Sequence, residues 1–337
     1  MKNLFIFLLI SVNIFAQKTV TVPFRQNLKD KSKMAKSLTV HDIREDKNIG
    51  SIVYRKENYD IKLPDDDLTN ILEKSFDEDN KTKGNTEFLV VVKKIKVGQI
   101  PKGKSHLSKI EFDIASFIKK EDKYYFIDRT KKTAFVKPGP NEDIPKLVAS
   151  KIGSKLSDFI TDSFSHPVSK YNITNDQLPN YETAVVAQTK IFSNEKLVDG
   201  VYKDFIHFIN QEPQKNYYVK KNKKGQIIGV GDVDGYDVFK SKVYAFVDEG
   251  KPYLLTPLNF WEMQKDGNGY YLFASREAID PEYKNNGAFV GMVAGGIVGG
   301  IVGGLIDASI SKNKVNDQNN FYNIYIDCLT GELLYEK

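Results

Sequence analysis

Apolar residues recur with a helical period at two places in the first half of the chain. A stripe from Leu68 to Phe76 follows three aspartates at 65–67, and aspartates at this position cap free amides and suit the positive end of the helix dipole. A second stripe, from Ile144 to Phe164, has Asp143 as its expected cap and stops before Pro167. The pattern predicts two amphipathic helices.

Between these helices the pattern changes to the short apolar runs that are typical of strands. The runs cover residues 87–92, 110–118, 123–128 and 133–136, and polar turns join the last three into an antiparallel meander. The order strand, helix, three strands, helix predicts an α+β fold, in which an antiparallel sheet carries two helices on one face.

The second half predicts a β-rich domain of hairpins after one short helix that begins at Asp199-Gly200-Val201. Turn pairs mark the hairpins, among them Glu249-Gly250 and Thr330-Gly331. The expected hairpins join 217–219 to 227–228, 243–247 to 253–255, 260–261 to 270–273, and 321–327 to 333–335. In the last of them Cys328 shares one strand face with Ile324 and Ile326, which predicts a buried, unreactive thiol.

One segment of the second half, residues 287–306, contains no charged residue. Within it, glycine recurs every four residues in two overlapping series, which we call files. The first file is Gly287, Gly291, Gly295, Gly299 and Gly303, and the second is Gly296, Gly300 and Gly304. As a helix the segment spans about 30 Å, the hydrocarbon thickness of a bilayer, with small residues along one side for close helix packing.

Such a helix is unstable alone in water, because eight glycines cost about 1 kcal/mol each relative to alanine. The segment therefore needs lipid, a tightly packed partner helix or burial in the domain. Membrane insertion, including shallow or re-entrant forms, and a soluble packed hairpin both fit the pattern. A single crossing conflicts with the hairpin expected at 321–336, since it separates that hairpin from its sheet.

Residues 1–16 have the layout of a secretory signal peptide: Lys2, an apolar run from Leu4 to Ile10 that is too short to span a bilayer, and Ala16 before the expected cleavage site. The protein is expected to be exported. Its single cysteine excludes an internal disulfide framework and multi-cysteine metal sites.

The 337 residues, 41% apolar and 28% charged, suit two domains of about 150 residues each. Residues 17–170 hold 31 Lys and Arg against 23 Asp and Glu, whereas residues 171–337 hold 17 against 21. This asymmetry indicates an α+β domain at 17–170 and a β-rich domain at 171–337, with the boundary in the proline-bearing stretch 165–180. Scattered, acid-interleaved lysines and the absence of a recognition motif argue against nucleic acid as a partner.

The sequence shows no pattern for catalysis or for a cofactor. The four histidines lie apart without metal-ligand spacing, and Gly-x-Ser-x-Gly and phosphate-loop motifs are absent; the histidines are His41, His106, His166 and His207. The run Asp232–Asp237 has its glycine and distal acid in the wrong places for a calcium loop, so it predicts a plain turn. We expect the protein to have no catalytic activity and to bind neither a cofactor nor a metal.

The residues from Val40 to Arg44, followed by Asn48-Ile49-Gly50 and this order of elements, resemble the YajG-like outer-membrane lipoproteins and the related auxiliary lipoproteins of ABC transporters. The likeness covers residues 36–165 and implies no catalytic residue. The chain departs from these lipoproteins in having no cysteine near Ala16 for a lipid anchor. Asp42 and Arg44 alternate on one strand face, where they can pair with each other, and Gly50 supplies a turn.

The second half resembles uncharacterised exported proteins of the bacterial envelope, a likeness that implies no activity. Together these features predict a non-enzymatic, exported envelope protein, periplasmic or outer-membrane-associated, that associates with a membrane or with itself through residues 287–306. The alternatives are a soluble secreted binding module with the glycine segment in its core and, as a third reading, a membrane-inserting toxin.

Overall fold

The computed structural model describes residues 18–335 except 25–26, 65–66, 103–104, 137–140, 194–195, 239–241, 257–259 and 280–320. The first half contains β1 (Lys18–Thr21), β2 (Ala35–Asp42), β3 (Ser51–Tyr54), β4 (Glu57–Lys62), α1 (Leu68–Asp79), β5 (Thr86–Lys102), β6 (Ser105–Lys120), β7 (Lys123–Val136) and α2 (Ile144–Ser163). The signal-peptide prediction at 1–16 and the eight glycines at 287–304 lie outside the described residues.

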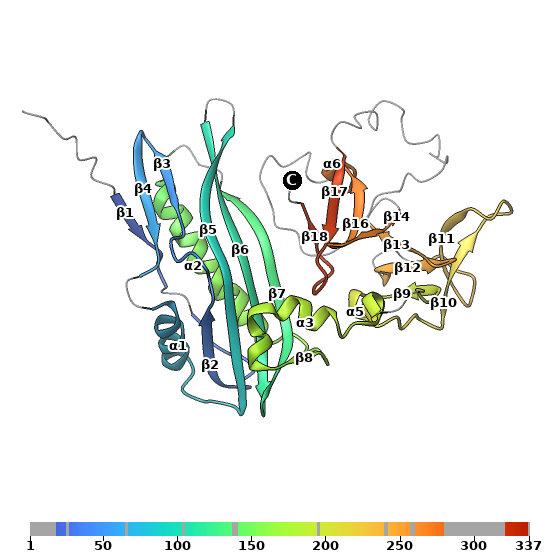
Figure 1. Cartoon of the computed structure of the whole chain (residues 1–337), viewed down its shortest axis with the longest axis horizontal. Coiled ribbons are helices and arrows are strands. Elements are labelled where there is room, and N and C mark those ends of the chain that lie inside the picture. Colours follow the sequence, from blue (N-terminus) through green and yellow to red (C-terminus); the bar gives the residue numbers. More distant parts are fainter. Residues whose placement is uncertain are drawn as a thin grey trace, which may run out of the picture.

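The second half begins with β8 (Asn172–Ile173), the 3-10 helix η1 (Asn175–Asn180), α3 (Tyr181–Val186) and α4 (Lys190–Ser193). It continues through β9 (Gly200–Tyr202), α5 (Phe205–Ile209), β10 (Tyr217–Lys221), β11 (Ile227–Asp232), β12 (Ala245–Asp248), β13 (Lys251–Leu255), β14 (Phe260–Glu262), β15 (Gln264–Asp266), β16 (Gly269–Ala274), α6 (Arg276–Ile279), β17 (Tyr322–Ile326) and β18 (Leu333–Leu334). The predicted α+β class is confirmed (Figure 1).

The central sheet has the strand order β2-β5-β6-β7-β8. Strands β5, β6 and β7 form the predicted antiparallel meander, while β2 lies parallel to β5. The prediction of two separate strands at 123–128 and 133–136 is wrong, because β7 is continuous from Lys123 to Val136. Its charged middle, which resembles a turn, pairs residue by residue with β6, as in Ala115 opposite Arg129. Pairing with a neighbouring strand here outweighs the local pattern.

Both predicted helices of the first half are present and capped as expected. Asp67 accepts a hydrogen bond from the Thr69 N–H at the start of α1, and Asp143 accepts one from the Lys146 N–H at the start of α2. The helices pack on one face of the central sheet, where the rings of Phe88 and Phe164 meet edge to face with centroids 4.9 Å apart. The expectation of two helices on one face is therefore confirmed.

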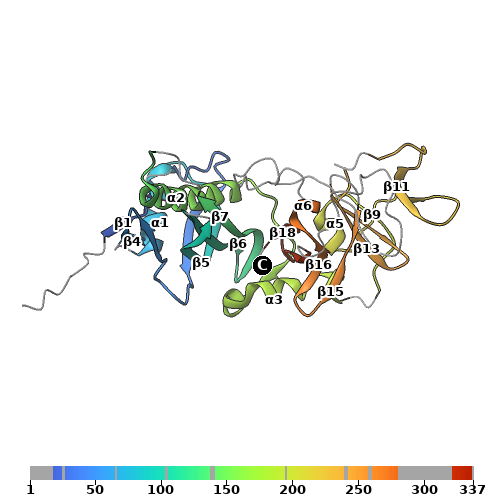
Figure 2. The ribbon, with the colours of Figure 1, turned by 90° about the horizontal axis from the view of Figure 1, so that it is seen from above.

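A second, three-stranded sheet of order β1-β4-β3 packs against α2, and the sequence pattern did not predict it. Its approach is close: a Cβ at Gly153 of α2 meets the Pro23 carbonyl oxygen at 2.3 Å, so only glycine fits there. In Figure 2 the helix α2 lies beside β1 and β4 at one end of the molecule.

In the second half, the hairpins β10–β11, β12–β13 and β17–β18 are confirmed. The hairpin that was expected to join 260–261 to 270–273 is wrong, because β14 pairs with β13, and β16 pairs instead with β15 across the Asp266–Gly269 turn. The short helix also begins later than predicted. Val201 lies in β9, and Asp204 caps α5 by accepting from the His207 N–H.

The face of the central sheet opposite the two helices is covered by the second half of the chain. Side chains that alternate with the helix-facing ones, such as Val91 and Phe117, share one buried cluster with Tyr181 of α3, Phe208 of α5 and Ile324 of β17. The stretch expected to separate the domains takes part in this packing, since β8 extends the sheet and Leu178 of η1 is buried. The two halves thus share a continuous core.

Candidate functional site

The strands that come before and after residues 280–320 in the chain are neighbours in one sheet. β16 and β17 are antiparallel partners, with Ala274 opposite Tyr322 and Phe273 opposite Asn323. The chain leaves this sheet through α6, which ends at Ile279, and returns to it at Tyr322. Antiparallel partners have Cα atoms about 5 Å apart, so β16 ends and β17 begins at the same end of one sheet, on either side of the part of the chain that carries the eight glycines.

A buried arginine fixes the returning strand to the first half of the chain. Arg129 of β7 donates from Nε and Nη2 to the two carboxylate oxygens of Asp113 at 3.0 and 2.9 Å. Its Nη1 donates to Oδ2 of Asp327, directly after β17, at 3.0 Å, and its Nη2 lies 3.0 Å from Oε1 of Glu182 in α3. One guanidinium therefore joins three carboxylates from three separate segments, which we call the Arg129 cluster.

Arg129, Asp113 and Asp327 are buried, and further contacts surround the Arg129 cluster. Tyr181 donates from its hydroxyl to Asp113 at 3.2 Å, and Lys93 lies 2.9 Å from Glu182. Burial alone lowers the pKa of Arg129, but the hydrogen bonds to Asp113 and the nearby charge of Asp327 together outweigh it and raise the pKa further above neutrality. Burial alone raises the pKa of Glu182, but Arg129 and Lys93 outweigh it and hold the pKa below the ordinary value. Arg129 and Glu182 therefore both stay charged at neutral pH.

The C-terminal turn has further contacts that hold it in place. Asp327 accepts hydrogen bonds from the Leu329 and Thr330 N–H groups through its Oδ1, which ends β17 and begins the turn. Gly331 in this turn has a φ of +76°, and a Cβ there meets the Phe205 ring of α5 at 2.5 Å. The predicted turn at Thr330-Gly331 is confirmed, and residues 321–335 fold as part of the second half.

Cys328 lies in this turn rather than on the buried face of the strand. β17 ends at Ile326, and the thiol is half-buried, so the prediction of a fully buried strand residue is wrong in its position. The reason is Asp327, whose side chain turns inward to Arg129 and breaks the alternation. Burial still raises the pKa of the Cys328 thiol to about 12, which keeps it protonated and unreactive at neutral pH.

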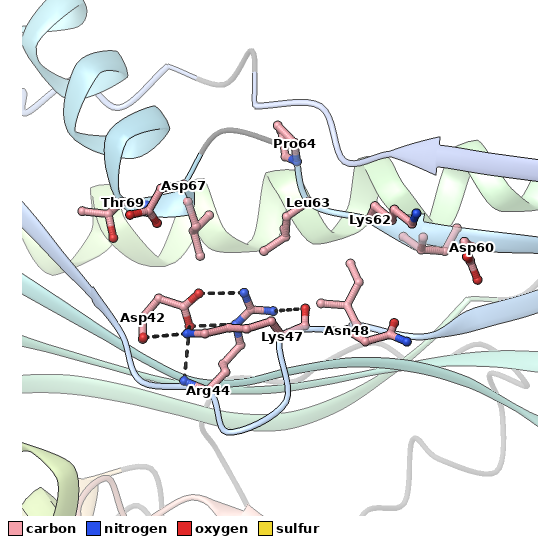
Figure 3. A pocket seen from close by; sticks show the side chains of 13 residues that line it. Asp42, Arg44, Lys47, Asn48, Asp60, Lys62, Leu63, Pro64, Asp67 and Thr69 are labelled. Atoms are coloured by element: carbon pink, nitrogen blue, oxygen red, sulfur yellow. Dashed lines mark hydrogen bonds and ion pairs between the residues drawn. The ribbon is translucent and has the colours of Figure 1, made fainter.

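A pocket of about 810 Å³ opens where β2 ends, between the β2–β3 loop, β4 and the start of α1 (Figure 3). It contains residues that carry the resemblance to envelope lipoproteins. Asp42 and Arg44 form the expected pair, with Nε and Nη2 of Arg44 donating to the two carboxylate oxygens at 2.8 and 2.7 Å. The floor is apolar and includes Ile49 and Leu68.

The charged wall of this pocket is engaged with protein groups. Lys47 lies 3.1 Å from Asp42, Arg44 also donates to the Lys47 carbonyl, and Asp67 caps α1. Burial alone raises the pKa of Asp42, but Arg44 and Lys47 outweigh it and lower the pKa. The Asp42–Arg44 pair therefore serves as a clamp on the β2–β3 loop. Gly50 ends this loop with a φ of +113°, beside the Val97 carbonyl, and confirms the predicted turn.

The remaining candidate groups of the sequence have structural contacts. Asp232 accepts hydrogen bonds from the Asp234 and Tyr236 N–H groups, as expected of a plain turn. His207 and His166 lie 2.6 and 3.0 Å from Asp204 and Asp128, respectively. Over the described ranges, no three His, Cys, Asp or Glu side chains gather as metal ligands, and no helix is long and apolar enough to cross a membrane.

The sequence reasoning missed the Arg129 cluster. A signal was present: Asp113 is an acid within the apolar run 110–118, and Arg129 follows the next run. Two opposite charges in neighbouring predicted strands indicate a buried pair, but Glu182 and Asp327 carry no such sign in the chain order.

Comparison of this chain with protein-family models, with curated proteins and with solved structures finds no match. The resemblance to YajG-like lipoproteins, drawn from residues 36–165, thus stays a prediction.

Proposed function

We propose that this protein is a non-enzymatic, exported envelope protein that associates with a lipid bilayer by inserting residues 287–306 from one side. The supporting observation is the frame of that segment, by which we mean the strand pairing and the ion pair that hold the chain before and after it. Ala274 and Tyr322 are antiparallel partners, and Asp327, five residues beyond the return, is bound to Arg129 of the first half. A chain held in this way at both ends enters and leaves a bilayer on the same side.

The composition of the segment suits such an insertion. Twenty uncharged residues, divided into two ten-residue helical halves, reach about 15 Å each, roughly half the hydrocarbon thickness. The four-residue glycine period gives each half a side of small residues, where a second helix approaches closely and packs by van der Waals contact. The four-residue period thus serves helix packing in a re-entrant hairpin, whereas a flexible polar linker needs no such period.

Export is the second part of the proposal, and residues 1–16 support it with a basic start, a short apolar run and Ala16. We expect the mature chain to begin at Gln17. N-terminal sequencing of the exported protein checks this, and retention of Met1 on the exported species contradicts it.

Cell fractionation tests the membrane part directly. The wild type is expected in a carbonate-resistant membrane pellet, and deletion of 287–306 is expected to move it to the soluble fraction. Changing Gly295 and Gly299 together to Leu blocks close helix approach and is expected to lower the fraction of the protein found in the membrane pellet. The matched control changes Ile297 and Ile301 to Leu, which keeps both the glycines and the hydrophobicity. A soluble wild type contradicts the proposal and supports the secreted binding module.

A further inference from the structure

The hairpin of β10 and β11 forms a sheet of its own at the end of the molecule farthest from β1, as both views show (Figures 1 and 2). One face of this hairpin packs on the second half through Tyr217, Val219 and Val230. Lys220 lies opposite Gly229 and Lys221 opposite Ile227, so Ile228 is the extra residue of a β-bulge, and it is 59% exposed.

The charge of this hairpin differs from that of the domain around it. Residues 213–231 contain five lysines and no acidic residue, although residues 171–337 as a whole are net acidic. Lys220 pairs with Asp237 at 2.6 Å, and Lys221 pairs with Asp248 and Glu249 at 2.8 and 2.9 Å. Lys223 and Lys224, at the turn, are exposed and make no ion pair with any residue that the structure describes.

The turn that presents these two lysines is held in a defined shape. Oδ1 of Asn222 accepts hydrogen bonds from the Lys224 and Gln226 N–H groups at 2.8 and 3.0 Å, and Gly225 takes a φ of +77°. The lysine pair therefore projects from the tip of the hairpin without ordering cost for its backbone.

Apolar and aromatic side chains accompany the lysines on the hairpin. Ile228 is the second residue of β11 and lies next to the turn, whereas Tyr218, 44% exposed, lies opposite Gly231 at the other end of the hairpin. An exposed isoleucine gains free energy when it leaves water, and a lysine near an anionic surface contributes attraction that weakens with salt.

We infer that the β10–β11 tip, formed by Lys223, Lys224 and Ile228, is a second membrane contact that binds an anionic lipid surface. This inference rests on the proposed membrane association but uses residues remote in sequence from the glycine segment. The lysine pair binds the anionic headgroups, and Ile228 enters the interfacial layer beside them. The tip orients the second half on the membrane, in addition to the insertion at 287–306.

Vesicle flotation of the full-length mature protein tests the tip, with anionic phosphatidylglycerol mixed into phosphatidylcholine and with phosphatidylcholine alone. Changing Lys223 and Lys224 to Glu is expected to lower affinity for the anionic vesicles at least about thirtyfold, since each lost lysine contributes roughly a factor of five. Affinity for phosphatidylcholine is expected to stay unchanged. Ile228→Ser is expected to lower binding to both vesicle types several-fold.

The matched control changes Lys119 and Lys120, beside the β6–β7 turn, to Glu, which alters the net charge equally. Unchanged anionic binding of the Lys223/Lys224 variant overturns the inference, and so does an equal loss in the control, which indicates net charge alone. A chain lacking 287–306 separates the two proposals. If this chain retains the lysine-dependent binding to anionic vesicles, the tip acts independently of the segment. If the deletion abolishes all binding, the tip inference fails while the insertion stands. If the deletion changes nothing, the insertion fails while the tip stands.

Discussion

Two arginines of the first half are almost fully buried, and they differ in which parts of the chain they hold together. The side chains of Arg44 and Arg129 are 4% and 2% exposed, and each binds both oxygens of one aspartate. The aspartate of Arg44 lies two residues away, at the end of β2, and Arg44 follows in the β2–β3 loop rather than on the strand as the sequence predicted. Arg129, in contrast, also reaches Glu182 and Asp327, so it joins segments nearly 200 residues apart in the sequence.

The difference separates a local clamp from a long-range one. Loss of Arg44 leaves Asp42 with Lys47, which lies 3.1 Å away and is open to water. Loss of Arg129 leaves Asp113 and Asp327 buried without their counter-charge, and a buried charge without a partner is strongly unfavourable. The first half thus stabilises the end of the second half, and with it the frame of the glycine segment.

The largest effect is expected from Arg129→Met. We expect the free energy of unfolding to fall by about 3–5 kcal/mol, because this variant leaves two buried carboxylates, those of Asp113 and Asp327, without their counter-charge. Urea unfolding followed by circular dichroism measures it, with Arg55→Met on the exposed β3–β4 turn as control. A loss below about 1 kcal/mol contradicts the role of the Arg129 cluster.

Arg44→Met is expected to cost less, about 1–3 kcal/mol, the typical penalty for one buried group that loses its hydrogen bonds. Lys47 remains beside Asp42, so no charge is left alone. The same urea titration measures the change. An effect equal to or larger than that of Arg129→Met reverses the comparison between the two sites.

The acid side of the pH profile sharpens the comparison further. The pKa of Glu182 is lowered in the folded protein, so its stabilisation is present above the unfolded pKa of about 4.3 and is lost as the pH falls through the lower folded value. Glu182→Gln is therefore expected to be less stable than the wild type at pH 7 and to match it near pH 2–3. A difference between the two that is independent of pH contradicts the ionic role of Glu182.

Cys328 is expected to report on the C-terminal turn with little effect on stability. Its pKa of about 12 and partial burial predict slow reaction with a water-soluble maleimide at pH 7.5 and fast reaction in denaturant. Arg129→Met should speed labelling of the folded protein and Arg44→Met should not. Equal labelling rates in the two variants show that Asp327 does not need Arg129 to hold the turn.

The same contrast explains what the sequence could predict. Caps and turns are local, so α1, α2 and the Gly250 and Gly331 turns follow from a few neighbouring residues. The Asp42–Arg44 pair is local as well. The continuity of β7, the pairing of β14 with β13 and the Arg129 cluster depend on partners far along the chain, which no local period encodes. The glycine period and the return of the chain to the sheet as a hairpin at 321–336 were visible in the sequence, but the pairing of β16 with β17 and the contact of Asp327 with Arg129 were not.

The most direct measurement concerns the side of the membrane on which the two ends of the segment lie. In a Cys328→Ser background, a single cysteine is placed at Lys284 or at Lys314, before and after residues 287–306. Each variant is bound to the outside of sealed vesicles and treated with a membrane-impermeant maleimide. Insertion from one side predicts that both positions are labelled from the outside to the same extent. Labelling of one position and protection of the other indicates a single crossing. Protection of both positions, with and without vesicles, indicates a segment buried in the domain. Either result contradicts the account.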